Sequence, residues 1–282
     1  MLLIADSGST KTDWALLSDN NSEISLFSTS GINPYYLEEN EIVSLLEKEF
    51  PKLCGSIDKI FFYGAGCTPM KKIHIYNVLK SFFNARCIEV HSDLYGAAIA
   101  LGQKEECIVS ILGTGSNSCH FDGVDIIYNV SPLGYILGDE GSGASLGKKL
   151  IADILKKQIN EEIINDFYSS YQITQEEIMI NVYHKPFPNR FLAQFTPFIL
   201  KHSSDKQISR IIETCFDEFF TRNIAQYKAY TELPLHFTGS IAYYFQEKLR
   251  QFIEKHGLIL GRITKTPLKG LIEFHKEKES NG

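Results

Sequence analysis

The chain has 282 residues, of which 44% are hydrophobic and 22% are charged, and its formal net charge at pH 7 is −6. This composition indicates a folded globular protein and excludes an intrinsically disordered one, while the net negative charge argues against a general surface for nucleic acid or anionic membranes. The apolar start reaches Asp6 without a basic segment and no run of about 18 apolar residues follows, so we expect a soluble, cytoplasmic protein.

The first third of the chain has the pattern of an α/β domain. Alternating apolar residues predict the strands, and apolar residues three or four positions apart predict the helices. The predicted elements are strands at 1–7, 13–17, 24–28, 57–64 and 86–91 and helices at 39–50, 69–83 and 94–102. Strands that alternate with helices of this length indicate a partly parallel sheet. Trp14 is expected to pack within its strand rather than to serve as a binding platform.

From Cys107 the pattern begins again and then becomes helical. A strand, a glycine turn and two further strands repeat the order seen at the start of the chain, which indicates a structural repeat with little sequence identity. The predicted elements are strands at 108–112, 118–121, 124–130, 235–238 and 258–263 and helices at 145–158, 161–171, 175–183, 190–201, 205–230, 241–255 and from 267 onwards. Thr174 with Glu177 predicts a capping box at one helix start, and Ser204 with Gln207 predicts another.

The cysteines are widely spaced, and the two nearest, Cys107 and Cys119, are 12 positions apart. Zinc and iron–sulfur sites usually use closer pairs, and the histidines form no paired motif either. We therefore expect no such metal site and no disulfide framework, and we interpret the cysteines as small buried hydrophobic residues. They are Cys54, Cys67, Cys87, Cys107, Cys119 and Cys215.

A polar turn follows the first predicted strand, at Asp6-Ser7-Gly8-Ser9-Thr10-Lys11-Thr12. Glycine has no Cβ, so its backbone N–H can close around an anion, and the hydroxyls and Lys11 add donors. Asp6 cannot bind phosphate directly because like charges repel, but it can hold the water shell of a Mg²⁺ ion. The alternative interpretation is a β-hairpin whose polar turn is only solvated.

A second turn of the same character follows the strand at 108–112. Its residues are Gly113, Thr114, Gly115, Ser116 and Asn117. Ser118 stands where a dinucleotide-binding fingerprint needs glycine, so the segment is not that motif. Alone this segment could be a plain hairpin. Two such turns after buried strands, however, predict that both turns bind one polyphosphate.

A third turn, Gly239-Ser240-Ile241-Ala242, leads from a strand into a helix. It could place backbone against an adenine or ribose ring, with the helix N-terminus favouring nearby negative charge. Turns of this kind are common in α/β proteins, so a purely structural role is the alternative.

Polar side chains in three other loops could handle an acceptor molecule. Asp93 follows a strand, where α/β proteins collect reactive groups, and could accept a proton from an alcohol; its alternative role is the N-cap of a helix from Leu94. Asp139 and Glu140 lie in a glycine-rich loop and could bind sugar hydroxyls, chelate a metal or cap the next helix. Asn33, in an Asn-Pro turn, could both donate to and accept from a ligand hydroxyl, or be structural only.

These segments resemble motifs of the acetate kinase, sugar kinase, Hsp70 and actin superfamily, and more closely those of the BadF/BadG/BcrA/BcrD-type ATPases and the N-acetylglucosamine kinases. Residues 6–12 are similar to the first phosphate motif, residues 113–116 to the second, and residues 239–242 to the adenosine motif. The resemblance implies an α/β fold of two ribonuclease-H-like domains that face each other across an ATP cleft.

The domains implied by this resemblance are an N-terminal one at 1–106, with a C-terminal helix at 267–280 packed on it, and a second at 107–266 with a helical insertion. The implied cofactors are ATP and Mg²⁺. Nucleotide contacts are implied at Asp6, Gly8, Ser9, Thr10, Lys11, Thr12, Gly113, Thr114, Gly115, Ser116, Gly239, Ser240 and Ala242. Asp93 is matched to the catalytic base, and Asp6 to the group that holds Mg²⁺ through water. Sugar contacts are implied at Asn33, Asp93, Asn117, Asp139 and Glu140.

The activity implied is in-line transfer of a phosphoryl group from ATP to an amino sugar, with the 6-hydroxyl of N-acetylglucosamine as the expected acceptor. Glucosamine, N-acetylmuramic acid and N-acetylmannosamine also fit these motifs. The alternative is a BadF-type ATPase activator, which couples ATP hydrolysis to a partner protein through shared iron–sulfur cysteines; this chain lacks that cysteine motif. Family members often form homodimers, although no pattern in this sequence identifies an interface, and no nucleic-acid or membrane partner is expected.

Overall fold

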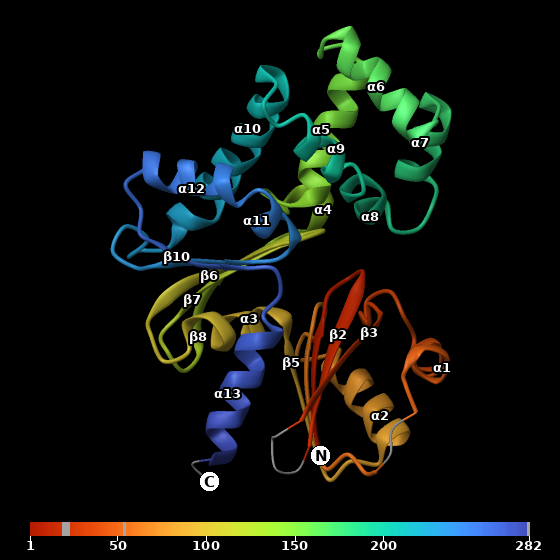
Figure 1. Ribbon diagram of the computed structural model, residues 1–282, viewed down its shortest axis with the longest axis vertical. Helices are drawn as coiled ribbons and strands as arrows, with labels where there is room; N and C mark the ends of the chain where they lie inside the picture. Colours follow the sequence, from red (N-terminus) through yellow and green to blue (C-terminus); the bar gives the residue numbers. More distant parts are fainter. Residues whose placement is uncertain (19–22, 53–54, 281–282) are drawn as a thin grey trace. The chain divides into compact units, whose positions relative to one another are not determined.

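The computed structural model divides into two compact units (Figure 1). It describes residues 1–18, 23–52 and 55–280. Unit 1 comprises the described residues of Met1–Val109, Phe121–Ile127 and Thr266–Gly282, and unit 2 comprises Ser110–His120 and Tyr128–Lys265. Within the described ranges, no helix is both long enough and apolar enough to span a membrane.

Unit 1 is built on a five-stranded sheet in the order β3-β2-β1-β4-β5. Its strands are β1 Leu2–Ser7, β2 Lys11–Leu17, β3 Ile24–Ser30, β4 Lys59–Gly64 and β5 Cys87–Ser92. The first three form the antiparallel meander that the sequence predicts, whereas β1, β4 and β5 run parallel, which confirms the mixed α/β sheet. Parallel pairing aligns the carboxyl ends of three strands, because Ser7 pairs with Gly64 and Gly64 pairs with Ser92.

Successive side chains of a strand point to opposite faces of its sheet. The side chains on both faces of β4 are buried, and helices cover both faces of this sheet. The helices of unit 1 are α1 Glu39–Glu49, α2 Lys72–Phe83, α3 Asp93–Gly102 and α13 Leu268–Ser280. In β4, Phe62 belongs to the core shared with α1 and α2. The preceding Phe61 points the other way and stacks on His275 of α13, with ring centroids 3.9 Å apart.

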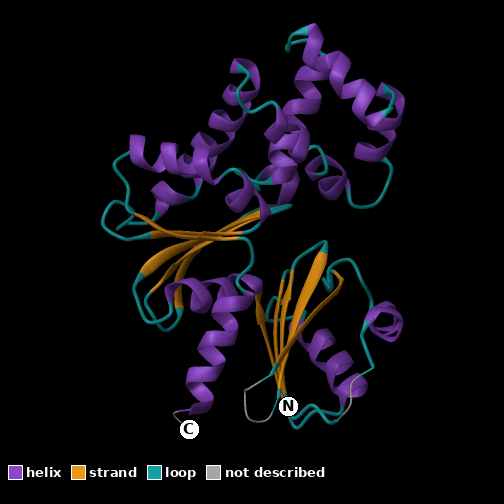
Figure 2. Cartoon of the chain, in the orientation of Figure 1, coloured by secondary structure: helices purple, strands orange, loops and turns teal. Residues whose placement is uncertain are grey.

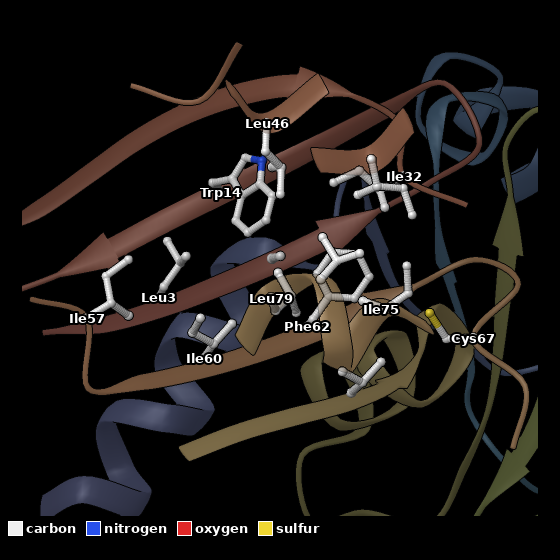
Figure 3. Close-up of a cluster of buried hydrophobic side chains, with 14 residues drawn as sticks. Leu3, Trp14, Ile32, Leu46, Ile57, Ile60, Phe62, Cys67, Ile75 and Leu79 are labelled. Atoms are coloured by element: carbon white, nitrogen blue, oxygen red, sulfur yellow. The ribbon is translucent and has the colours of Figure 1, made fainter. Parts of the chain in front are cut away.

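Trp14 belongs to the buried core that also contains Leu46 of α1 and Leu79 of α2 (Figure 3). Its side chain is fully buried, and its Nε1 donates to Thr29 Oγ1 at 3.0 Å. Its ring stacks on Phe27 and meets Phe50 edge-on, with centroids 6.3 and 5.2 Å apart. A buried tryptophan with a satisfied N–H contributes a large apolar area to a core. The interpretation of Trp14 as a packed strand residue is therefore confirmed.

The second sheet has the order β10-β9-β6-β7-β8. Its strands are β6 Cys107–Leu112, β7 Ser116–Phe121, β8 Ile126–Val130, β9 Leu235–Thr238 and β10 Leu260–Thr264. Taken from β8, this is the strand order of the first sheet, with β6 in the place of β1 and β9 in the place of β4. The repeat predicted from Cys107 onwards is confirmed in its topology, and the fold is a pair of α/β domains of the ribonuclease-H-like type.

The segment between β8 and β9 is almost wholly helical (Figure 2). The helices of unit 2 are α4 Gly134–Leu137, α5 Gly143–Leu155, α6 Glu161–Tyr171, α7 Gln175–Tyr183, α8 Pro188–Ala193, α9 Thr196–Lys201, α10 Lys206–Arg222, the 3₁₀ helix η1 Ile224–Gln226, α11 Ser240–Tyr244 and α12 Gln246–Lys255. Helices α6 and α7 have the predicted bounds, and α4 was not predicted because its four residues are too few to show a helical period.

The single helix predicted at 190–201 is wrong, because the structure has two helices there. Pro197 lies in the first turn of α9 and has no N–H to donate to the carbonyl of Ala193. Thr196 Oγ1 donates to that carbonyl instead, at 2.9 Å.

Two other predicted helices are too long. The helix expected at 205–230 ends at Arg222, and only the short η1 follows. The helix expected at 241–255 breaks at Phe245, whose backbone leaves the helical conformation at φ −100° and ψ 19°. Phe245 is buried at the break, so the apolar spacing continues across it and the sequence pattern cannot show the interruption.

The helix caps were predicted correctly at one site and wrongly at another. Thr174 and Glu177 form the expected capping box at the start of α7. At α10 the N-cap is Asp205 rather than Ser204: the Asp205 carboxylate accepts from the backbone N–H groups of Gln207 and Ile208, at 2.8 and 3.2 Å.

Four cysteines are buried as expected, and Cys87 is half-buried. The buried ones are Cys67, Cys107, Cys119 and Cys215. None of these five forms a disulfide, and Cys54 lies outside the described residues.

The cap assignment predicts a difference between two neighbouring substitutions. Asp205→Ala should lower the free energy of unfolding by about 1 kcal/mol, because two N–H groups of the first turn lose their acceptor. Ser204→Ala is the matched control and should change it by less than about 0.5 kcal/mol. Denaturant unfolding of both variants measures the difference, and an equal loss in the two would show that Asp205 does not cap the helix.

Candidate active site

The turn between β1 and β2 in unit 1 is held tightly by backbone contacts. Gly8 N donates to Lys11 O at 2.9 Å, and Gly31 N donates to Thr10 O at 3.0 Å. A Cβ at Gly31 would overlap the backbone of Gly8, Ser9 and Lys11, so only glycine allows the end of β3 to lie this close. The sequence places Gly31 in the Asn-Pro turn after the third strand but does not show its contact with this turn.

Two hydroxyls support this turn from beneath. Ser7 Oγ and Thr12 Oγ1 are 2.7 Å apart, and both accept from Ile32 N, at 3.1 and 3.2 Å. Both side chains are fully buried. Thr12, expected to contact nucleotide, therefore positions the turn in this structure, whereas Thr10 and Lys11 are exposed and Lys11 pairs with Asp13 at 2.7 Å.

Asp6 and Asp93 lie together at the carboxyl ends of the parallel strands. Asp6 is the residue before the end of β1, and Asp93 directly follows β5. Both are half-buried. The pKa of Asp6 is raised from 3.8 to about 8, mainly by burial and also by the negative charge of Asp93. Burial likewise raises the pKa of Asp93 from 3.8 to about 6, against hydrogen bonds from backbone N–H groups that lower it.

Asp93 is held in place without being the helix cap. Ser92 is the N-cap of α3, and its Oγ accepts from Tyr95 N at 3.2 Å. Asp93 is the first helical residue, and its Oδ1 accepts from Leu94 N at 2.9 Å. The alternative interpretation of Asp93 as an ordinary N-cap is therefore wrong, and its carboxylate lies beside that of Asp6.

The turn that follows β4 packs against the side chain of Asn33, which lies in the segment after β3. Gly66 has φ +78°, and a Cβ there would overlap the Asn33 side-chain amide. Asn33 is only 6% exposed, and its Oδ1 accepts from Tyr35 N at 2.9 Å, so its Nδ2 is the group left to donate to a ligand. Cys67 in this turn is buried, and burial together with the charge of Asp93 raises its pKa to about 12, so it remains a thiol.

The carboxylates of unit 1 suit a magnesium ion held mainly through water. Mg²⁺ prefers hard oxygen ligands and keeps several of its waters, and a cation near Asp6 and Asp93 would relieve the repulsion between them. Among the described residues there is no group of three or more histidine, cysteine, aspartate or glutamate side chains that could form an all-protein cage. Asp6, with water, is therefore the group that fits the ion.

The second glycine turn, in unit 2, is bonded to the start of α5. Gly113 N donates to Gly115 O at 2.9 Å. Gly143 N donates to Gly113 O at 2.8 Å, and Ala144 N donates to Thr114 O at 3.0 Å. These bonds use two of the N–H groups that a helix leaves unpaired at its first turn. The turn and the helix start are therefore one connected piece of backbone.

Asp139 closes over this turn from the glycine-rich loop. Its Oδ1 accepts from Ser116 N at 3.2 Å, and its carboxyl lies against Gly115. Asp139 has φ +54°, a left-handed conformation that is uncommon for a residue with a Cβ. Burial raises its pKa to about 6.

The other two predicted sugar contacts in unit 2 differ in what they offer a ligand. Asn117 Oδ1 accepts from Ser118 N and from Asn129 Nδ2, both at 2.9 Å, so the Nδ2 of Asn117 is left to donate. Glu140 is buried, and both of its carboxylate oxygens are bonded, to Arg222 at 2.8 Å and Asn223 at 3.3 Å. Asn129 and Arg222 were missed by the sequence reasoning, because neither lies in a motif.

The third turn lies against the second. Gly239 has φ +111°, and a Cβ there would overlap the carbonyl of Leu112, directly before Gly113. Ser240 is exposed at the start of α11. Ala242, which was expected to contact nucleotide, is fully buried, so in this structure its side chain supports the turn from within the core.

No family model and no curated protein sequence matches this chain. A solved structure from Porphyromonas gingivalis, provisionally named an N-acetylglucosamine kinase, is 46% identical; the match covers 99% of this chain and 100% of the other, with a TM-score of 0.94. A Chromobacterium violaceum structure, named in the same way, is 17% identical over 97% of this chain and 98% of its own, with a TM-score of 0.76. A ROK family glucokinase from Streptomyces griseus, solved with glucose and AMPPNP, is 11% identical over 98% of both chains, with a TM-score of 0.57. The last two show likeness of fold alone.

Because the pKa of Asp6 is raised, the folded protein without ligands should become less stable as the pH rises. Between about pH 4 and pH 8 the unfolded chain releases the Asp6 proton while the folded chain retains it, so folding becomes less favourable as the pH rises. Asp6→Asn removes this cost. Its melting temperature without Mg²⁺ or nucleotide should exceed that of the wild type by at least about 2–4 °C at pH 8, with a smaller gap at pH 5.

The control for this comparison is Asp166→Asn in unit 2. Hydrogen bonds from Lys201 and His202 hold the pKa of Asp166 below its usual value, so its loss should give no gain at pH 8. Differential scanning fluorimetry across the pH range measures both variants. A gap between Asp6→Asn and the wild type that is constant from pH 5 to pH 8 would contradict the prediction.

Proposed function

The chain belongs to the N-acetylglucosamine kinase family, and we propose that it transfers the terminal phosphoryl group of ATP to the 6-hydroxyl of an amino sugar, with N-acetylglucosamine as the acceptor. The observation that carries this proposal is the half-buried carboxylate of Asp93, held by a backbone N–H beside a second carboxylate, Asp6. A sugar kinase needs such a group to take the proton of the attacking hydroxyl.

Asp93 is the proposed general base. A base works best when its pKa lies near the working pH, because it is then both deprotonated and basic enough to accept a proton. Burial brings the pKa of Asp93 to about 6, well above the ordinary value of an aspartate. The hydrogen bond from Leu94 N to Oδ1 directs the carboxylate, and Oδ2 is the proposed acceptor of the hydroxyl proton as the oxygen attacks phosphorus.

We propose that the two glycine turns contact the phosphates of ATP and that the Gly239 turn contacts its adenosine. In unit 1 the proposed contacts are Gly8, Ser9, Thr10 and Lys11, and in unit 2 they are Gly113, Thr114, Gly115 and Ser116. Phosphoryl transfer depends mainly on positioning and on neutralising charge, and rigid backbone turns serve both needs. Asp6 would hold Mg²⁺ through water, and the ion supplies charge neutralisation on the phosphates when bound.

The proposed acceptor contacts supply both kinds of hydrogen-bonding group that a sugar needs. Asn33 and Asn117 each have their side-chain oxygen bonded within the protein, so their Nδ2 groups donate. The Asp139 carboxylate accepts. Sugar hydroxyls both donate and accept, and an acetamido oxygen only accepts, so each of these groups matches one that an N-acetylated hexosamine presents. Glu140 is bonded internally at both oxygens and is proposed to act by shaping the loop.

The proposed function predicts a defined product. With MgATP, N-acetylglucosamine should raise ADP release well above basal hydrolysis, and NMR of the product should show phosphate on the 6-oxygen. The 6-deoxy analogue of N-acetylglucosamine is the matched control, which should bind but accept no phosphate. If no member of a hexosamine panel raises ADP release above the basal rate, the kinase proposal fails and the ATPase-activator alternative is favoured.

A second prediction concerns Asp93. Asp93→Asn should keep its affinity for ATP while kcat falls by about 10²–10⁴, because the amide cannot accept the hydroxyl proton. For the wild type, kcat/KM should fall as the pH drops below about 6, since protonated Asp93 cannot act as a base. Asp125→Asn, at an exposed aspartate, is the surface control. Transfer close to the wild-type rate in Asp93→Asn would place the catalytic base elsewhere.

A further inference from the structure

We propose that Arg222 is a positioning residue for the acceptor site: the last turn of α10 holds the Asp139–Gly141 loop in its binding conformation through Glu140. This inference rests on the proposed function, because it takes Asp139 to be a sugar contact. Arg222 itself lies outside the predicted contacts and acts on them through another side chain.

One face of α10 contacts the loop at Glu140 and Gly141. Cys215, Phe219, Arg222 and Asn223 are spaced at positions that share a face of a helix and its C-cap. Gly141 has φ +77°, and a Cβ there would lie 2.9 Å from Cβ and Cγ of Phe219, so the loop backbone packs directly on that side chain. The Gly141 backbone also hydrogen-bonds the Cys215 thiol.

The carboxylate of Glu140 bonds the loop to the end of α10. Its Oε1 pairs with Arg222 Nε at 2.8 Å, and its Oε2 accepts from Asn223 Nδ2 at 3.3 Å. The Glu140 side chain is 10% exposed, whereas that of Arg222 is 59% exposed. A carboxylate so nearly buried is costly unless it is paired, so removing Arg222 leaves a charge that the loop can relieve only by moving toward water.

Movement of Glu140 would also move its neighbour in the loop, Asp139. Asp139 keeps a left-handed conformation, and such strain persists only where the surrounding structure enforces it. Its Oδ1 contact with Ser116 N, at 3.2 Å, depends on that conformation. Release of Glu140 would let the loop relax and move the Asp139 carboxylate away from the position in which it can accept from the sugar.

The kinetic test compares Arg222→Met, Arg222→Lys and Arg210→Met. Arg222→Met keeps the length of the side chain and removes its charge, and it should raise KM for N-acetylglucosamine about tenfold or more while KM for ATP stays unchanged, as for other supporting residues of a binding site. Arg222→Lys keeps the charge and should recover part of the loss. Arg210, also on α10, is exposed, so Arg210→Met should match the wild type. Equal rises in both KM values, or none, would overturn the inference.

The route through Glu140 is tested by a double-mutant comparison. If Arg222 acts only by holding Glu140, then adding Arg222→Met to Glu140→Gln should raise KM for the sugar by less than twofold further. A full tenfold additional rise would show that Arg222 acts independently, and would overturn the proposed route.

Hydrogen exchange separates this inference from the proposed function. In Arg222→Met without ligands, amides of the 139–145 segment should exchange at least tenfold faster than in Arg210→Met, with strands β6 and β7 unchanged. Faster exchange supports the grip on the loop even if the wild type phosphorylates no sugar, a result that would refute the proposed function alone. Unchanged exchange overturns the inference whatever the activity.

Discussion

The repulsion between two half-buried carboxylates, Asp6 and Asp93, is the constraint on which the chemistry of unit 1 depends. Parallel pairing of β1, β4 and β5 brings the carboxyl ends of these strands to one edge, and the chain places an acidic residue at two of them. Burial raises both pKa values, and for Asp6 the negative charge of Asp93 adds to the rise, which costs folding stability near neutral pH. In the proposed function the same arrangement supplies Asp93 as a base with a pKa of about 6 and Asp6 as the group that holds a divalent cation, so the unfavourable energy accompanies the proposed activity.

The site in unit 2 relies on enforced backbone conformation instead. Asp139 and Gly141 both have positive φ, and the loop that contains them is bonded to the Gly113 turn on one side and packed on α10 on the other. Glu140 is bonded at both oxygens, so the proposed role of shaping the loop falls to Glu140 and the proposed ligand contact to Asp139. The two carboxylates look equivalent in sequence, but that of Glu140 is bonded to Arg222 and Asn223, whereas that of Asp139 accepts from Ser116 N.

Much of the fold was predictable from local pattern, and most of the site's support was not. The buried strands show clear alternation, and the glycine turns after β1 and β6 could be recognised from residue type alone. By contrast, Asn223 bonds to Glu140 across 83 positions and Asn129 to Asn117 across 12, and no local pattern records such contacts. The helix break at Phe245 was missed for the opposite reason: its buried side chain continues the apolar period, so the pattern is intact where the backbone is not.

The two sheets share one strand order, yet their glycine turns are braced from different strands. In unit 1, Gly31 at the end of β3 lies against the turn after β1, whereas in unit 2, Gly239 at the end of β9 lies against the turn after β6. β9 stands in the place of β4, and in unit 1 the turn after β4, with Gly66, packs on Asn33. The position that the proposal gives to adenosine in one unit is thus given to the acceptor in the other. The two copies of one strand order therefore differ in which strand end carries the close-packed glycine.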